Sequence, residues 1–139
     1  MKSVTNDIIS AAILIIGNEI LSGRTQDTNV QFLGKGLVQL GICLSEVRVV
    51  PDVEDDIIDA INTLRSRFDY LFTTGGIGPT HDDITTACVS KAFGVDVVRH
   101  PVAETLLLER YKPEDVNEAR MKMADVADGA KLIDNPISV

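Results

Sequence analysis

The stretch from position 70 to position 92 constrains the fold of this chain more than any other. It begins with an apolar run at residues 70–72 and two threonines, and then places three glycines within four residues, at positions 75, 76 and 78. From Ile84 onward the pattern becomes helical. A simple turn needs one glycine and this one has three, so the stretch predicts a strand, a glycine-rich functional loop and a helix.

This arrangement favours an anionic ligand. Glycines have no Cβ, so a ligand can approach the main chain closely. The helix after the loop leaves its first backbone N–H groups without intrahelical partners, and its positive dipole end attracts a phosphate. The loop has neither the Gly-Lys-Ser/Thr of a Walker A loop nor the spacing of the dinucleotide fingerprint. The sequence therefore predicts a site for a small phosphorylated molecule outside those two classes.

Two carboxylates, Asp82 and Asp83, stand beside this predicted phosphate site. Paired carboxylates next to a phosphate indicate either a divalent metal such as Mg²⁺ or a proton-transfer role. Asp83 has a second interpretation, because aspartate is also a common helix cap. His81 lies inside the same loop and is a candidate for ligand contact. The residues by themselves leave these alternatives open.

The motif T-G-G-I-G-P-T-H-D-D-I-T, at residues 74–85, resembles the signature of the molybdopterin-binding domain family. This family includes molybdenum-cofactor biosynthesis enzymes and the N-terminal domain of competence-damage-inducible (CinA-like) proteins, and the His-Asp-Asp version is more similar to the second branch. The resemblance implies molybdopterin as ligand or, in the CinA-like branch, metal-dependent cleavage of a pyrophosphate such as ADP-ribose. It also implies that seven residues of the motif contact the ligand: Thr74, Gly75, Gly76, Gly78, Pro79, Thr80 and His81.

A second candidate loop follows the apolar run at residues 11–16, which is typical of a strand buried on both faces of a parallel sheet. The resembling family carries a G-x-E-[I/L]-L-x-G…T-N pattern here, which lines its ligand cleft. Glu19 could bind a hydroxyl or a metal, or be a surface carboxylate at a strand end. The residues that match the family pattern are Gly17, Glu19, Gly23, Thr28 and Asn29.

Asp52 stands at the end of the second predicted strand, residues 42–50. Open α/β sheets place ligands at the carboxyl ends of their strands. The resemblance implies that an aspartate after this strand is one of two functional aspartates in the cofactor-biosynthesis branch, and Asp83 aligns with the other. We therefore expect Asp52 and Asp83 as the catalytic pair, with Asp82 and Asp83 as the ligands of a possible Mg²⁺.

The remaining patterns predict helices that alternate with the strands. We expect one from Asp27 or Thr28 to about Leu40, with an apolar face made of Val30, Leu33, Leu37 and Leu40 and with Gly34 and Gly36 as close-packing points against the sheet. Further helices are expected over residues 53–65, 84–93, 102–110 and 113–123. This alternation predicts an α/β fold, a three-layer α/β/α sandwich with a mostly parallel sheet. In such a sheet the loops after the strands lie at one edge.

Length and composition limit the functional classes. With 139 residues we expect a single domain over residues 1–139, and the resemblance implies that the family's C-terminal portion is missing from it. The net charge of −8 argues against nucleic-acid binding, which needs clustered Lys and Arg. Two separated cysteines, no signal peptide and no apolar run of membrane-spanning length predict a cytoplasmic protein without a membrane partner.

We therefore expect a protein that binds molybdopterin or an adenine nucleotide, and the resemblance to the CinA-like branch implies a metal-dependent pyrophosphatase. The alternative is a binding or regulatory module that keeps the fold without turnover. The family tends to self-associate, so the resemblance also implies a homo-oligomer.

Overall fold

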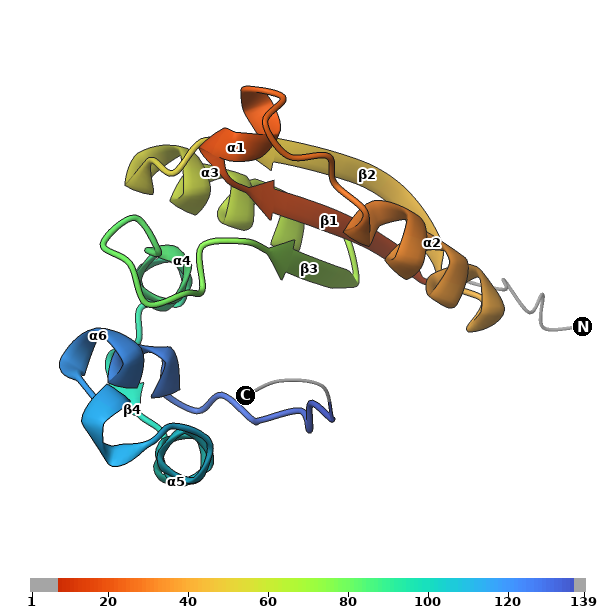
Figure 1. Cartoon of the computed structure of the whole chain (residues 1–139). Helices are drawn as coiled ribbons and strands as arrows, with labels where there is room; N and C mark the ends of the chain where they lie inside the picture. Colours follow the sequence, from red (N-terminus) through yellow and green to blue (C-terminus); the bar gives the residue numbers. More distant parts are fainter. Residues whose placement is uncertain (1–7, 137–139) are drawn as a thin grey trace, which may run out of the picture. The chain divides into compact units, whose positions relative to one another are not determined.

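The computed structural model describes residues 8–136, and the contacts within it divide the chain into two compact units, Met1–Thr74 and Gly75–Val139. The first unit is a parallel sheet with helices, and the second is a set of helices with a two-stranded antiparallel sheet (Figure 1). None of the helices described in either unit has the length and apolar character needed to cross a membrane.

The sheet of the first unit has three parallel strands in the order β2-β1-β3. Its central strand, β1 (Ser10–Ile16), is buried along six consecutive residues, as expected for an apolar run with a neighbour on each side. The edge strands are β2 (Cys43–Val50) and β3 (Tyr70–Thr74). Burial alternates along much of β2, in agreement with its alternating apolar and polar residues. The predicted α/β fold with a parallel sheet is confirmed.

Two helices cover the faces of this sheet. The chain leaves β1 through α2 (Asn29–Gln39) to reach β2 on one side, and returns from β2 through α3 (Glu54–Arg65) to reach β3 on the other. Right-handed crossovers in opposite directions place two helices on opposite faces, and Figure 1 shows α2 in front of the sheet and α3 behind it. The first unit therefore has three layers, α/β/α.

The ends of α2 differ from the sequence expectation. Leu37 is buried, but Leu40 is 74% exposed, so the prediction that Leu40 belongs to the buried face was wrong. Leu40 caps the helix at its C-terminus and the chain turns at Gly41, which has a φ of +74°, so this side chain leaves the face that Leu37 occupies. Gly36 was also predicted wrongly as a packing point, because a Cβ there would meet open space.

The second unit begins with the glycine loop, which we define as residues 75–83, and continues into α4 (Thr85–Phe93). Strand β4 (Val97–Arg99) and helix α5 (Pro101–Arg110) follow. His100 caps α5, since its Nδ1 accepts a hydrogen bond of 3.3 Å from the Val102 amide. The core of this unit contains Leu107, Met121 and Ala124.

The single helix predicted over residues 113–123 was wrong. The chain forms three short pieces there: η1 (Pro113–Asp115), α6 (Glu118–Met121) and η2 (Lys122–Ala124). The break occurs at Val116 and Asn117, which have extended backbones. The Asn117 side chain accepts a 2.9 Å hydrogen bond from the Arg120 amide and so starts a new helix.

Strand β5 (Asp125–Ala127) was not predicted from the sequence. It pairs antiparallel with β4, so that Val97 lies opposite Ala127 and Arg99 opposite Asp125. Each of these strands is three residues long, which is too short to show a period in the sequence, and each forms by pairing with a partner that is distant in the chain.

Candidate functional site

The glycine loop reverses the chain between β3 and α4 in a conformation that needs glycine. Gly75 and Gly76 have φ angles of +89° and +65°, in the left-handed region that L side chains rarely adopt. Thr85, at the start of α4, closes the loop: its amide donates to the Gly76 carbonyl at 3.0 Å and its hydroxyl to the Gly75 carbonyl at 2.8 Å. Thr85 is 2% exposed, so this closure is protected from water.

Asp83 organises the rest of the loop. Its Oδ2 accepts hydrogen bonds from the Thr80 amide at 2.8 Å and from the Thr80 hydroxyl at 2.7 Å. A Cβ on Gly78 would lie 2.8 Å from the same oxygen, so the carboxylate occupies the space that a side chain at position 78 would need. Helix α4 follows Ile84 and has no side-chain cap, so Asp83 does not act as its cap.

The pKa of Asp83 reflects two opposing effects. Partial burial favours the neutral acid and acts to raise the pKa. The Thr80 hydroxyl, the amides of Thr80 and Gly78 and the charge of Lys122 all favour the carboxylate, and together they hold its pKa below the ordinary value of 3.8. Asp83 is therefore a fixed, ionised acceptor inside the loop at neutral pH.

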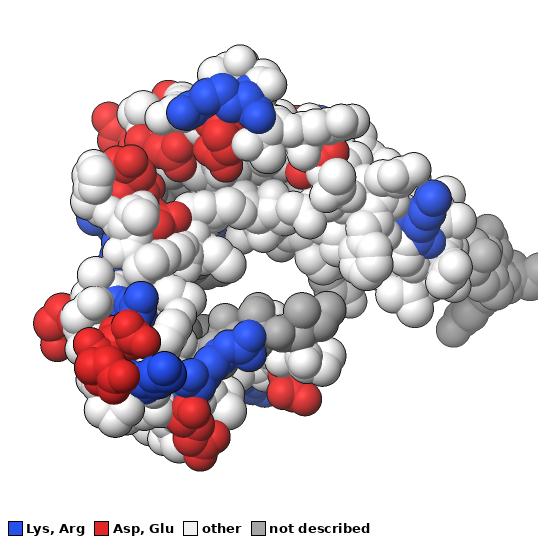
Figure 2. Space-filling model, viewed as in Figure 1, with Lys and Arg blue, Asp and Glu red and all other residues white. Residues whose placement is uncertain are grey.

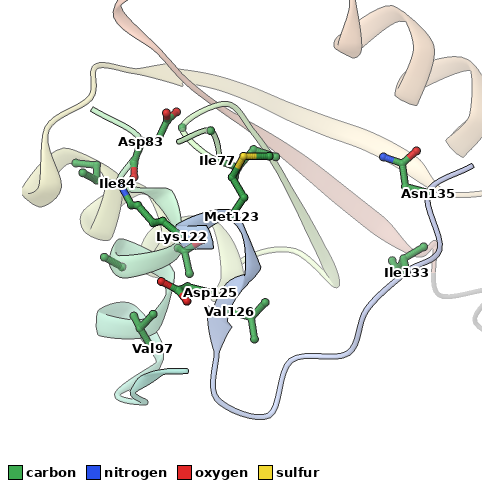
Figure 3. A pocket seen from close by; sticks show the side chains of 14 residues that line it. Ile77, Asp83, Ile84, Val97, Lys122, Met123, Asp125, Val126, Ile133 and Asn135 are labelled. Carbon is green, nitrogen blue, oxygen red and sulfur yellow. Dashed lines mark hydrogen bonds between the residues drawn. The ribbon is translucent and has the colours of Figure 1, made fainter. Parts of the chain in front are cut away.

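Lys122 also binds the loop, from η2. Its Nζ donates to the Thr80 carbonyl at 3.0 Å and to the Asp83 carbonyl at 2.6 Å. Figure 3 shows the Lys122 side chain extending to the part of the loop where Asp83 lies. Sequence analysis missed this residue, because 39 positions separate it from Asp83 and an isolated lysine in a predicted helix carries no signal of such a contact.

A cavity of about 560 Å³ lies beside the glycine loop (Figure 3). This volume is in the range of sites for small molecules. Gly76 and Gly78 line it, together with Thr86 and Ala87 from the first turn of α4. Its apolar wall consists of Ile77, Ile84, Val97, Met123, Val126 and Ile133, and its polar lining consists of Asp83, Lys122, Asp125 and Asn135.

His81 and Asp82 form the exposed part of the loop. His81 Nε2 lies 2.8 Å from Asp82 Oδ1, and the two side chains are 92% and 69% exposed. Neither lines the cavity, and neither does Pro79, although all three stand in the loop beside it. Residues 8–136 contain no group of three or more His, Cys, Asp or Glu side chains that could hold a metal ion.

The candidate residues of the first unit gather after β1 and β2. Asp52 Oδ2 accepts a 2.9 Å hydrogen bond from the Asn18 amide, and Asn18 Oδ1 accepts one of 3.4 Å from the Asp52 amide. A Cβ on Gly17 would lie 2.5 Å from both oxygens of Glu19, so this carboxylate folds back over the strand end. Asp52 thus joins the two loops, and Glu19 lies against one of them.

Residues 18–21, expected to be loop, form the one-turn helix α1 (Asn18–Leu21). Gly23 follows it with a φ of +74°. Thr28 and Asn29 stand at the start of α2, whose first turn is held by Asp27: its Oδ2 accepts a 2.9 Å hydrogen bond from the Val30 amide. In Figure 2 acidic side chains gather over α1 and the start of α3, where Glu54, Asp55 and Asp56 form the first turn.

Thr74 ends β3 opposite Ile15 of β1, and the glycine loop follows it directly. The structure thus brings Gly17, Glu19 and Asp52 together in the first unit. It brings the glycines, Thr80 and Asp83 together in the second.

Comparison with known proteins identifies the family. Residues 12–131 match the family model described as a probable molybdopterin binding domain. The chain belongs to this family. The match runs through both units and contains the glycine loop and the loops after β1 and β2.

Relatives of this molybdopterin-binding domain include CinA-like proteins. The CinA-like protein of Gloeobacter violaceus is 38% identical over 130 residues, which cover 92% of this chain and 30% of that protein. A protein of Pyrobaculum calidifontis is 38% identical over 130 residues, covering 92% of this chain and 50% of the relative. The chain therefore spans about half the length of the second relative and less than a third of the first.

A solved structure supports the same assignment. The crystal structure of the CinA protein from Thermoplasma acidophilum is 33% identical, with a TM-score of 0.86 that covers 93% of this chain and 76% of that one. The resemblance to the competence-damage-inducible branch, inferred from the His-Asp-Asp motif, is confirmed at the level of the family and the fold.

Proposed function

We propose that this molybdopterin-binding domain holds a small phosphorylated ligand, molybdopterin or an adenine nucleotide, at the glycine loop. The observation that carries the proposal is the loop itself: Gly75 and Gly76 in left-handed conformations, beside a cavity that the start of α4 also lines. Because no side chain caps α4, the amides of Thr86 and Ala87 can serve as phosphate donors.

The two sides of the cavity suit the two halves of such a ligand. The glycine loop and the start of α4 offer backbone amides to a phosphate, while Ile84, Val97 and Val126 offer an apolar wall to a ring system. Thr74, Pro79 and His81 belong to the same motif and are proposed as further contacts from the loop. From the first unit, Gly17, Glu19, Gly23, Thr28 and Asn29 are proposed as ligand-contacting residues on the family pattern.

The second candidate is a metal-dependent hydrolase that cleaves the pyrophosphate of an ADP-ribose-like substrate. Asp82 favours it, because this carboxylate lies in the loop, is 69% exposed and can reach a cation. With no three-ligand group in residues 8–136, a Mg²⁺ would need oxygens from the ligand's phosphates in addition to Asp82 or Asp83. Asp52 and Asp83 are the aspartates proposed for the reaction.

Titration calorimetry of the chain with molybdopterin, ADP-ribose and ATP, each with and without Mg²⁺, tests these proposals when the products are analysed in the same samples. Cleavage of ADP-ribose only with Mg²⁺ would support the hydrolase. Binding of molybdopterin without turnover would support the binding or regulatory module. Failure to bind any of the three would contradict the first proposal.

Substitution separates binding from catalysis. Asp83→Asn keeps an oxygen for the Thr80 amide and removes the charge, so a hydrolase should lose turnover while most of its affinity for ADP-ribose remains. If Asp52→Asn and Asp83→Asn both leave turnover intact, the catalytic assignment is wrong.

We also propose that the chain forms a homo-oligomer in the cytoplasm and that a second copy covers α2. Phe32 and Val38 on this helix are 79% and 73% exposed. Lys35 is the one charged residue of α2, so a second copy would meet little repulsion there although the chain carries a net charge of −8. Light scattering of wild type and Phe32→Ser measures this: the variant should dissociate, and an unchanged mass would contradict the proposed surface.

A further inference from the structure

We propose that Lys122 positions the glycine loop for its ligand and supplies the positive charge of the anion site. This inference rests on the proposed function, because it assigns a role within the same cavity. Nothing in the motifs of the sequence pointed to this residue; the inference comes from its contacts with two loop carbonyls.

The first step of the argument is the way in which Lys122 fixes the loop. Its ammonium binds the carbonyls of Thr80 and Asp83, while the Asp83 carboxylate binds the Thr80 amide and hydroxyl. Both sides of residue 80 are therefore held, its amide by Asp83 and its carbonyl by Lys122. In a trans peptide the N–H points away from the C=O of the same peptide group. When Lys122 binds the carbonyls of Thr80 and Asp83, it therefore also sets the direction of the amide that follows each of these residues.

The second step is the support of Lys122 itself. Met121 precedes Lys122 in the chain and Ala124 follows it by two positions. Both belong to the core of the second unit and are 6% and 0% exposed. They pack with Leu107 of α5 in one hydrophobic cluster. The backbone from which Lys122 extends is therefore anchored in the core, and the ammonium of Lys122 joins the loop to that core.

The third step is charge. Among the described residues that line the cavity, Lys122 is the one cationic side chain, beside two carboxylates. Asp125 is paired with Arg99, and Asp83 accepts hydrogen bonds inside the loop, so both negative charges are partly compensated. An ammonium has three protons, and those bonds to Thr80 and Asp83 use two. The third is available to a phosphate oxygen of the ligand.

The experiment compares Lys122→Met with Lys112→Met, which removes the same charge from an exposed lysine of the same unit. Amide hydrogen exchange of residues 75–83 is measured on the ligand-free proteins, and affinity is measured by calorimetry with ADP-ribose. We expect Lys122→Met to speed exchange in the loop and to weaken binding at least tenfold, because hydrogen bonds to a charged group are lost. Lys112→Met should change neither.

Lys122→Arg and Lys122→Gln complete the test. Arginine keeps the charge and should restore most of the affinity and its salt dependence, whereas glutamine keeps donors for the carbonyls and should restore slow exchange more than affinity. If Lys122→Met unfolds the chain, these two variants decide the question by themselves.

Loop exchange and affinity equal to those of the Lys112→Met control would overturn the inference. Failure of wild type to bind ADP-ribose would instead remove the proposed ligand, and the exchange data on the ligand-free proteins would still test whether Lys122 positions the loop.

Discussion

Two loops that follow strands of the same parallel sheet use an aspartate in different ways. After β2, Asp52 accepts one amide, that of Asn18, and the exposed carboxylates around it leave the region acidic. After β3, Asp83 accepts from both the amide and the hydroxyl of Thr80, while Lys122 binds two carbonyls of the same loop. The loop after β2 is held by two hydrogen bonds between Asp52 and Asn18, whereas the loop after β3 is held by a network of hydrogen bonds that includes the ammonium of Lys122.

This difference supports the proposal that the glycine loop, and not the loop after β2, binds the phosphate of the ligand. A phosphate near Asp52 would meet Glu19 and the acidic first turn of α3, which repel it. A phosphate at the glycine loop would meet backbone amides and the ammonium of Lys122. The two aspartates that the family resemblance pairs thus stand in opposite electrostatic surroundings, each within its own unit.

The largest expected effect is the loss of stability when each aspartate is replaced by alanine. Asp83→Ala leaves the Thr80 amide and hydroxyl without their acceptor and should lower the free energy of unfolding by about 2 kcal/mol. Asp52→Ala removes one helix-start hydrogen bond and should cost about 1 kcal/mol. Urea denaturation of both variants measures this. Equal losses would mean that the denser network around Asp83 adds no stability.

A smaller effect should come from the glycines, with opposite signs in the two units. Gly76→Ala forces a Cβ into a φ of +65° and should destabilise by about 1 kcal/mol. Gly36→Ala, in the helical conformation of α2 with open space around the new Cβ, should stabilise by about 0.5–1 kcal/mol. Thermal unfolding of the two variants beside wild type tests the pair. A stabilised Gly76→Ala would show that the loop does not need its left-handed backbone.

The smallest effect should be the dependence of stability on pH. The pKa of Asp83 is lowered in the folded state, so its contribution is complete above the ordinary value of about 3.8 and is lost as the pH falls through the folded-state value. Asp83→Asn cannot titrate, so wild type should lose more stability than the variant between pH 6 and pH 3. The acid-sensitive carboxylates Glu46 and Asp69 are present in both proteins and cancel in the difference. Equal losses of stability in wild type and Asp83→Asn would contradict the conclusion that ionised Asp83 stabilises the fold.

The sequence predicted the first unit well because its elements are long enough to show a period. Residues 11–16 are continuously apolar and form the buried centre of the sheet. Apolar residues recur three or four positions apart in the helix predicted over residues 53–65, and Ile57, Ile61 and Leu64 among them are buried in α3. The glycine loop was predicted from three glycines in four positions, and two of them have positive φ. In each case the residues that cause the structure are neighbours in the chain.

The second unit was predicted less well because its structure depends on distant partners. β5 exists through pairing with β4, and the break near Val116 depends on Asn117 starting a new helix instead of continuing the old one. The burial of Met121 is part of a cluster with Leu107 from α5, which no local pattern of these short segments indicates.

The sequence by itself determined the α/β class, the family and the position of the candidate site, because short-range patterns of apolar residues and glycines carry that information. Only the tertiary structure decided what the side chains of the site do. In the folded chain Asp83 accepts a hydrogen bond from Thr80, and Lys122, which is 39 positions further along the chain, binds the Asp83 carbonyl in the same loop. The physical reason is that hydrogen bonds and charges act over a few ångströms in space, whatever the separation along the chain.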